Sequence, residues 1–120
     1  MVLRTFTLFS LFLLSAGFSS GITAEPEHIK PNQPYYADEF TRDGEIARLG
    51  EERNYEEVFK NYEYYEAIYD ELKRPVIFRA YRRGEVSWSE RYFYDPHGKL
   101  IKKEIVREGK PTETRRFDGP

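Results

Sequence analysis

The stretch VIFRAYRRGEVSWSERYFYDPHGKLIKKEIVR, residues 76–107, decides the fold. Its β-branched and aromatic residues recur at every second position between short glycine-containing turns, which is typical of antiparallel strands. Asp95-Pro96-His97-Gly98 is the strongest turn signal, because Pro presets φ and Gly accepts the positive φ that such a turn requires. The stretch therefore predicts successive hairpins that turn at Arg83-Gly84 and Pro96-His97.

Two segments that lie 25 residues apart begin and end alike: YDELKRPVIFRAYRRG from Tyr69 and YDPHGKLIKKEIVREG from Tyr94. A repeat of this length, with one hairpin per unit, predicts units that share a single antiparallel meander sheet. A turn at Glu108-Gly109 and a strand over 112–117 extend this sheet. Residues 40–53 show a similar spacing from aromatic residue to glycine, and we interpret them as a weaker third copy.

Residues 54–72 leave two alternatives open. Their apolar spacing is helical, and Asn54 with Glu57 matches a helix N-cap followed by an acid three positions later. The repeat register and a content of five Tyr in fifteen residues favour strands instead. We predict strands here, with a hairpin tip at Lys60-Asn61, and keep the helix as the alternative.

The N-terminal residues have the order of a secretory signal peptide: Arg4, an apolar run, and small residues up to a cleavage site after Ala24. The alternative is an uncleaved membrane anchor. The chain has no Cys, so the exported domain must be stable without disulfides. We predict a periplasmic or secreted protein with no stable membrane span after cleavage. Its parts are a signal peptide (1–24), an extended Pro-rich tether (25–38) and a β-hairpin repeat domain (39–120).

Charge is distributed unevenly along the chain. Residues 25–71 contain 14 acidic and 5 basic side chains, whereas residues 72–120 contain 7 acidic and 13 basic ones. Either acidic strands pair with basic strands across the sheet, or the basic half binds an anionic partner. We favour pairing, and we predict no nucleic-acid partner. The expected cross-strand partners are Glu63, Glu66, Arg79, Arg82 and Arg91.

No group of residues in the sequence matches a catalytic or metal-binding pattern. His28 and His97 lie far apart, without a second ligand at metal-binding spacing. Ser87 and Ser89 have no nearby His that would activate them as nucleophiles. We therefore predict a non-catalytic protein with no metal and no cofactor.

The Tyr-Asp-x-x-Gly-Lys-Leu of Tyr94–Leu100 and the Arg-x-Gly-Lys of Arg107–Lys110 resemble bacterial tandem β-hairpin repeats of the YD and MORN-like kinds. The resemblance covers about residues 54–119, and it departs from the pattern at Lys73, which stands where the first copy should have glycine. It implies a β-hairpin repeat fold in a bacterial envelope protein, and it implies no activity.

Aromatic residues are the one excess in composition: ten Tyr, five Phe and one Trp follow residue 24. Tyr can build the core of a thin sheet, which we favour, or it can form an exposed binding row. The predicted function is a module that binds another envelope or secreted protein. The alternative is a small-ligand or glycan-binding module that uses an exposed Tyr-rich face. The candidate binding residues are Tyr62, Tyr64, Tyr65, Tyr81, Trp88 and Tyr92.

Overall fold

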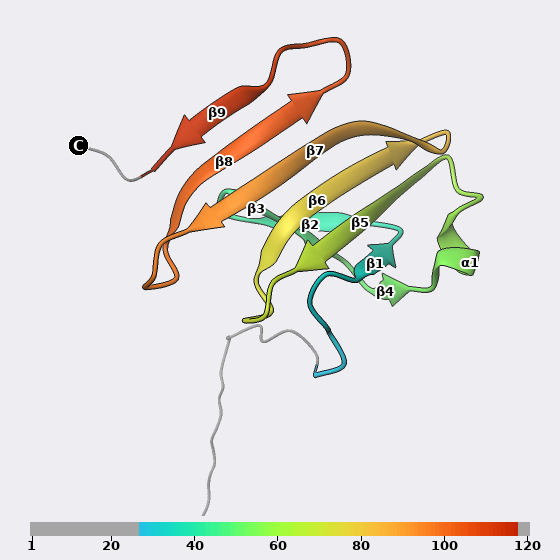
Figure 1. The fold of residues 1–120 in the computed structure, drawn as a ribbon. Coiled ribbons are helices and arrows are strands. Elements are labelled where there is room, and N and C mark those ends of the chain that lie inside the picture. Colours follow the sequence, from blue (N-terminus) through green and yellow to red (C-terminus); the bar gives the residue numbers. More distant parts are fainter. Residues whose placement is uncertain (1–26, 118–120) are drawn as a thin grey trace, which may run out of the picture.

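The computed structural model describes residues 27–117, which form a mainly β domain. The strands are β1 (Pro34–Ala37), β2 (Phe40–Asp43), β3 (Ile46–Leu49), β4 (Glu52–Arg53), β5 (Glu63–Tyr69), β6 (Pro75–Arg82), β7 (Glu85–Tyr94), β8 (Leu100–Arg107) and β9 (Glu113–Arg116); one helical turn is α1 (Tyr55–Val58). Seven of these strands form an antiparallel sheet in the order β4-β1-β5-β6-β7-β8-β9, and β2 pairs with β3 in a separate hairpin (Figure 1).

The predicted meander is confirmed for β5 to β9, where each strand pairs with the next. The turn glycines Gly84, Gly98 and Gly109 all have positive φ, as the turn chemistry requires. The single sheet is an incomplete description, because β2–β3 forms a second small sheet. This hairpin carries its own apolar residues, and it buries them by packing on the large sheet rather than by extending it.

The tether predicted over 25–38 is wrong in its described part. Ile29 is only 5% exposed, and β1 pairs with both β4 and β5. The physical reason is that the edge of β5 offers unpaired backbone groups, while Ile29, Tyr35 and Ala37 supply apolar side chains. The folded domain therefore includes residues before 39. The predicted signal peptide lies outside the described residues, among which no helix is long and apolar enough to cross a membrane.

Residues 54–72 contain both predicted alternatives in succession. The backbone N–H of Asn54 donates to the Glu57 carboxylate at 2.7 Å, and this caps α1 at its start. The strand β5 follows from Glu63 onward. Lys60-Asn61 is not a hairpin tip, because these residues connect a helical turn to a strand. Tertiary pairing with β1 and β6 overrides the helical spacing after this first turn.

Two turns of the meander have the same hydrogen bonds. In residues 70–74 and 95–99 the leading Asp carboxylate accepts the N–H groups two and four positions later, at 2.8–2.9 Å. The fourth residue has φ of +63° at Lys73 and +86° at Gly98. Lys73 therefore adopts the positive φ that glycine adopts at the equivalent position 98 of the second turn.

This equivalence predicts opposite effects for two substitutions. Gly98→Val should lower the free energy of unfolding by about 1–2 kcal/mol, because a branched side chain is strained at positive φ. Lys73→Gly should raise it by up to about 1 kcal/mol, because glycine adopts this φ without strain. Urea denaturation measures both changes. A destabilised Lys73→Gly variant would show that its side chain matters more than its backbone.

Candidate functional site

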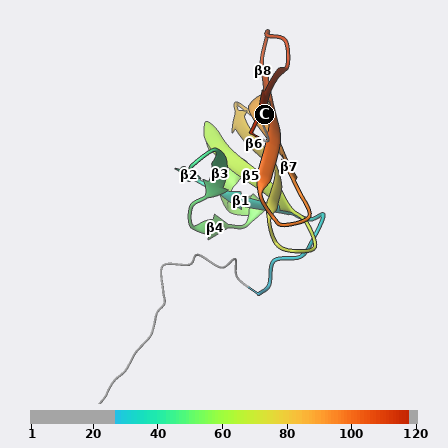
Figure 2. The ribbon, with the colours of Figure 1, turned by 90° about the vertical axis from the view of Figure 1, so that its left-hand side faces the viewer.

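The hairpin β2–β3 lies on one side of the large sheet, which we call the covered face (Figure 2). The ring of Phe40 lies 4.7 Å from Tyr65 and 5.5 Å from both Phe78 and Trp88. Tyr92 is 2% exposed, and its hydroxyl accepts the Ala47 N–H at 2.8 Å. Tyr65, Trp88 and Tyr92, three of the predicted binding residues, are therefore packed under the hairpin.

The other three predicted residues lie elsewhere. Tyr64 and Tyr81 stack on the opposite face of the sheet, with ring centroids 4.8 Å apart and planes at 6°. Tyr62 precedes β5 at the end of the sheet and is 56% exposed. The predicted set does not form one row, because neighbouring strand residues such as Tyr64 and Tyr65 point to opposite faces.

A network of charged groups fixes the hairpin to the covered face. Glu90 is 3% exposed and accepts two hydrogen bonds from Arg42, at 3.1 and 2.8 Å, and one from the Tyr92 hydroxyl at 2.6 Å. Lys103 is 2% exposed and donates to the Glu45 carbonyl oxygen at 2.8 Å. Sequence reasoning missed this network, because Glu90 and Lys103 have the residue types of solvated strand positions.

Burial opposes the ionisation of Glu90, but the hydrogen bonds from Arg42 and Tyr92 and the charge of Lys103 outweigh it and lower the pKa of Glu90. Glu90 is thus an ionised carboxylate that is already bound by Arg42, Tyr92 and Lys103 of the same chain. The nearby depression of about 290 Å³ also contains Arg107 and Arg115. These two arginines bind the Glu113 carboxylate at 2.9 and 2.7 Å. The charged groups around this depression therefore pair with one another and stabilise the fold.

The side of the sheet opposite the hairpin, which we call the open face, has no second layer of described residues over it (Figure 2). One row across the strands contains Tyr36, Glu66, Arg79, Ser89 and Val106, and the next contains Ile68, Ile77, Arg91, Glu104 and Thr114. Two of the predicted cross-strand ion pairs form, both between β5 and β6. Glu66 lies 2.6 Å from Arg79, and Glu63 lies 2.9 Å from Arg82. The predicted neutralisation of acidic by basic strands is confirmed there.

Aromatic rings gather at one corner of the open face, which we call the aromatic corner. Successive ring centroids are 5.4, 5.3, 6.2 and 4.8 Å apart along the series Phe59, Tyr55, Tyr36, Tyr64 and Tyr81. Tyr55 and Phe59 are 47% and 41% exposed, and Val86 and Val106 on the same face are 43% and 46% exposed. Four of the six exposed large hydrophobic side chains in the described chain thus lie on this face.

Tyrosine ionisation should destabilise the fold at alkaline pH. Burial and then the Glu66 carboxylate raise the pKa of Tyr36 to about 12, and burial raises the pKa of Tyr94 to about 12. Burial and the hydrogen bond to Glu90 also raise the pKa of Tyr92. These phenols stabilise the fold fully below their ordinary pKa of about 10, and the stabilisation is lost as pH rises from there towards the folded-state values.

Phenolate absorbance and far-UV circular dichroism, followed together from pH 9 upward, test this expectation. Part of the tyrosine signal should appear only together with loss of the β signal. Tyr36→Phe should make stability less sensitive to pH above about 10. Complete tyrosine ionisation near pH 10 in a folded protein would contradict the expectation.

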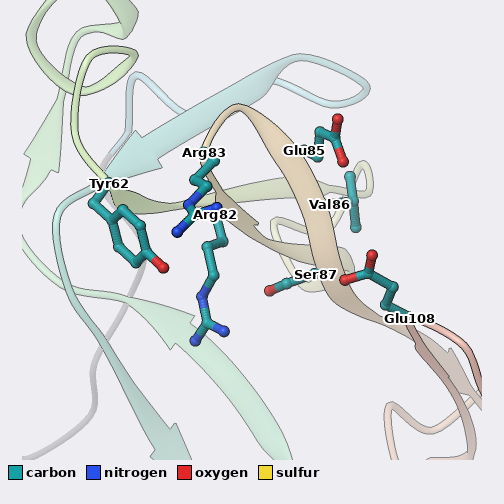
Figure 3. Close-up of a pocket in the computed structure, with 7 residues that line it drawn as sticks. All are labelled: Tyr62, Arg82, Arg83, Glu85, Val86, Ser87 and Glu108. Atoms are coloured by element: carbon teal, nitrogen blue, oxygen red, sulfur yellow. The ribbon is translucent and has the colours of Figure 1, made fainter.

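A shallow depression of about 470 Å³ lies at one end of β6 and β7 (Figure 3). The guanidinium groups of Arg82 and Arg83 lie 5.9 and 5.5 Å from the centroid of the Tyr62 ring. Glu85 and Glu108 lie on the other side of the depression (Figure 3). The site is polar and open, and it combines one exposed ring with side chains of both charges.

The two sheet edges are poorly suited to strand addition. β4 has two residues, and β9 has four, of which three are charged: Glu113, Arg115 and Arg116. Short and charged edges are the usual means by which sheets avoid pairing with another chain. Of the surfaces of the large sheet, the open face therefore suits a partner better than either edge does.

Comparison with known proteins adds no relative: no protein-family model, no curated protein and no solved structure matches this chain.

Proposed function

We propose that this chain is an exported, non-catalytic module, periplasmic or secreted, whose open face binds another protein. The observation that carries the proposal is a sheet face without a second layer of described residues, on which Tyr55, Phe59, Val86 and Val106 are each more than 40% exposed. The exposed rings of Tyr55 and Phe59, stacked with centroids 5.4 Å apart and surrounded by polar residues, are the kind of surface that marks interaction sites on soluble proteins.

The composition of the open face also favours a protein partner. Tyr and Arg are the residue types enriched at the energetic centres of protein interfaces, and this face carries Tyr55 and Tyr81 with Arg79 and Arg91. The ion pair between Glu66 and Arg79 already satisfies the most buried charge of the face. A partner can therefore cover the centre without leaving an unpaired carboxylate beneath it.

Paired substitutions on and off the open face test the proposal. Tagged wild-type protein, Val106→Glu and Leu72→Glu would be cross-linked in cells of the source organism, and their partners identified by mass spectrometry. Leu72 is a suitable control because it is 71% exposed and lies in the β5–β6 turn. Val106→Glu should lose the cross-linked protein and Leu72→Glu should retain it. Equal cross-linking by both variants would contradict binding at this face.

Export is tested separately by mass spectrometry of protein recovered from the same cells. The expected N-terminus is Glu25 or a residue shortly before it, because Ile22 and Ala24 fit the small-residue pattern of a cleavage site. Intact Met1 in the membrane fraction would indicate an anchored protein.

The small-ligand alternative has one supporting observation, the exposed Tyr62 ring beside Arg83 in the depression at the end of β6 and β7. A ring next to a guanidinium group suits an acidic sugar, which offers a flat apolar side and a carboxylate. A panel of acidic glycans should then bind wild-type protein and not Tyr62→Ala. Equal binding to both proteins would place any glycan site elsewhere.

A further inference from the structure

We propose that the protein bound at the open face is a second copy of this chain, in a two-fold symmetric dimer. This inference rests on the proposed function, since it names the partner of the same face. It follows from the chemistry of two opposite corners of the face, which complement each other.

The first corner is aromatic and acidic. Tyr55 and Phe59 are stacked there with centroids 5.4 Å apart, and each is a little under half exposed. Glu56 and Glu57 of α1 lie between them in the sequence and are also exposed. This corner therefore presents ring faces and carboxylates together.

The second corner has a net positive charge, and we call it the basic corner; its one carboxylate among the described strand residues is Glu104, 3.9 Å from the Lys102 ammonium. It consists of Arg91, Lys102 and Arg116, whose positions on β7, β8 and β9 place them on the open face. Arg91 and Arg116 are exposed, and the Lys102 ammonium lies 4.3 Å from the ring centroid of Phe93. Cations of this kind bind both carboxylates and aromatic faces.

The two corners are diagonally opposite on the sheet. The aromatic corner adjoins β1, and Tyr64 and Tyr81 continue it at the start of β5 and the end of β6. The basic corner lies on β7 to β9, and Lys102 pairs with Phe93 near the end of β7 (Figure 1). A two-fold axis between two facing open faces can therefore place the aromatic corner of each copy on the basic corner of the other.

Such an arrangement is isologous, so each corner contact is made twice. Between the corners lie Ile68 and Ile77, directly paired across β5 and β6, which would meet their symmetry mates near the axis. Two sheets that pack face to face in this way form a sandwich, whose centre here contains Ile68 and Ile77 beside the paired Glu66 and Arg79.

The size of the face suits a stable dimer. Strands about 4.8 Å apart with a rise of about 3.3 Å per residue give β1 and β5–β9 a plane of roughly 600 Å². Standard protein interfaces bury about 800 Å² of accessible surface on each partner, and side chains make accessible area larger than the plane beneath them. Other partner classes fit the face less well. A nucleic acid or an anionic membrane would meet Glu66 beside Arg79 and Glu104 beside Arg91, and it would also cover Glu56 at the opposite corner.

Sedimentation of the purified exported protein across a range of concentrations tests the dimer. We expect a reversible monomer–dimer equilibrium that Val106→Glu shifts towards monomer by about tenfold or more in Kd, because a charge replaces an exposed apolar side chain of the open face. Leu72→Glu should leave the Kd unchanged.

A charge exchange tests the arrangement of the corners. Arg91→Glu and Glu56→Arg should each weaken the dimer, and the double variant should recover most of the loss, because it restores opposite charges across the interface. Circular dichroism checks that each variant is folded.

Monomer at every concentration would overturn the inference, as would a dimer that is insensitive to Val106→Glu and to Arg91→Glu. If the chain is monomeric and Val106→Glu still abolishes cross-linking to a different protein, the open face remains an interaction site and only the second-copy inference fails. If that cross-linking is also unaffected, the proposed function fails as well.

Discussion

Replacing Glu90 with Leu is expected to lower the free energy of unfolding by about 3–5 kcal/mol, because it removes the buried carboxylate that Arg42 and the buried Lys103 share. Glu90 accepts two hydrogen bonds from Arg42 and lies 3.5 Å from the Lys103 ammonium, which is itself only 2% exposed. The substitution also removes the acceptor of the Tyr92 hydroxyl. Urea denaturation followed by Trp88 fluorescence measures the change, and it reports on the core beneath the hairpin.

Two further variants separate this explanation from a general loss of stability. Glu63→Ala removes an ion pair with Arg82 that is exposed on both sides, so its unfolding midpoint should stay close to wild type. The double variant Glu90→Leu with Lys103→Met should recover part of the loss, because two apolar side chains replace the central buried pair. An effect of Glu90→Leu no larger than that of Glu63→Ala would mean that solvent reaches the network.

The parts of this fold that could be predicted are those set by residues close together in the sequence. Strands β6 to β9 and their turns follow from alternation and from glycine or aspartate at fixed positions, which are properties of neighbouring residues. The positions of β1 and of the β2–β3 hairpin depend on contacts between distant segments. Ile29 beside Tyr69, for instance, needs residues forty positions apart in the chain to meet in one core. Nothing in the Pro-rich composition of residues 25–38 indicates that contact.

The sequence predicted the type of residue at the candidate site but not which of these residues are exposed. The excess of tyrosine correctly indicated aromatic packing, and Tyr64, Tyr69 and Tyr92 are all buried. Which tyrosines remain exposed depends on the hairpin that covers one face, and this was not visible in the sequence. The same hairpin makes Glu90 and Lys103 buried residues although their strands would otherwise expose them.

Phe78→Ala should have the other large effect on stability, and it distinguishes the two faces of the sheet. Phe78 is fully buried, and its ring centroid lies 5.5 Å from Phe40, 5.7 Å from Trp88 and 6.0 Å from Tyr65. Its loss should lower the free energy of unfolding by about 3–5 kcal/mol, because the surrounding rings cannot collapse fully into the cavity.

The neighbouring residue Ile77 provides the matched control, since it lies on the same strand and points to the open face. It is only partly buried in the single chain, so Ile77→Ala should lower the free energy of unfolding of dilute monomer by about 1 kcal/mol. At high protein concentration the difference in unfolding free energy between wild type and Ile77→Ala should become larger. Dimer formation raises the apparent stability of the folded state, and the variant dimerises less well. Phe78→Ala leaves the open face intact, so its loss of unfolding free energy relative to wild type should be the same at both protein concentrations. Equal losses for Ile77→Ala and Phe78→Ala in dilute protein would mean that the open face is already covered within one chain, and would contradict both proposals for it.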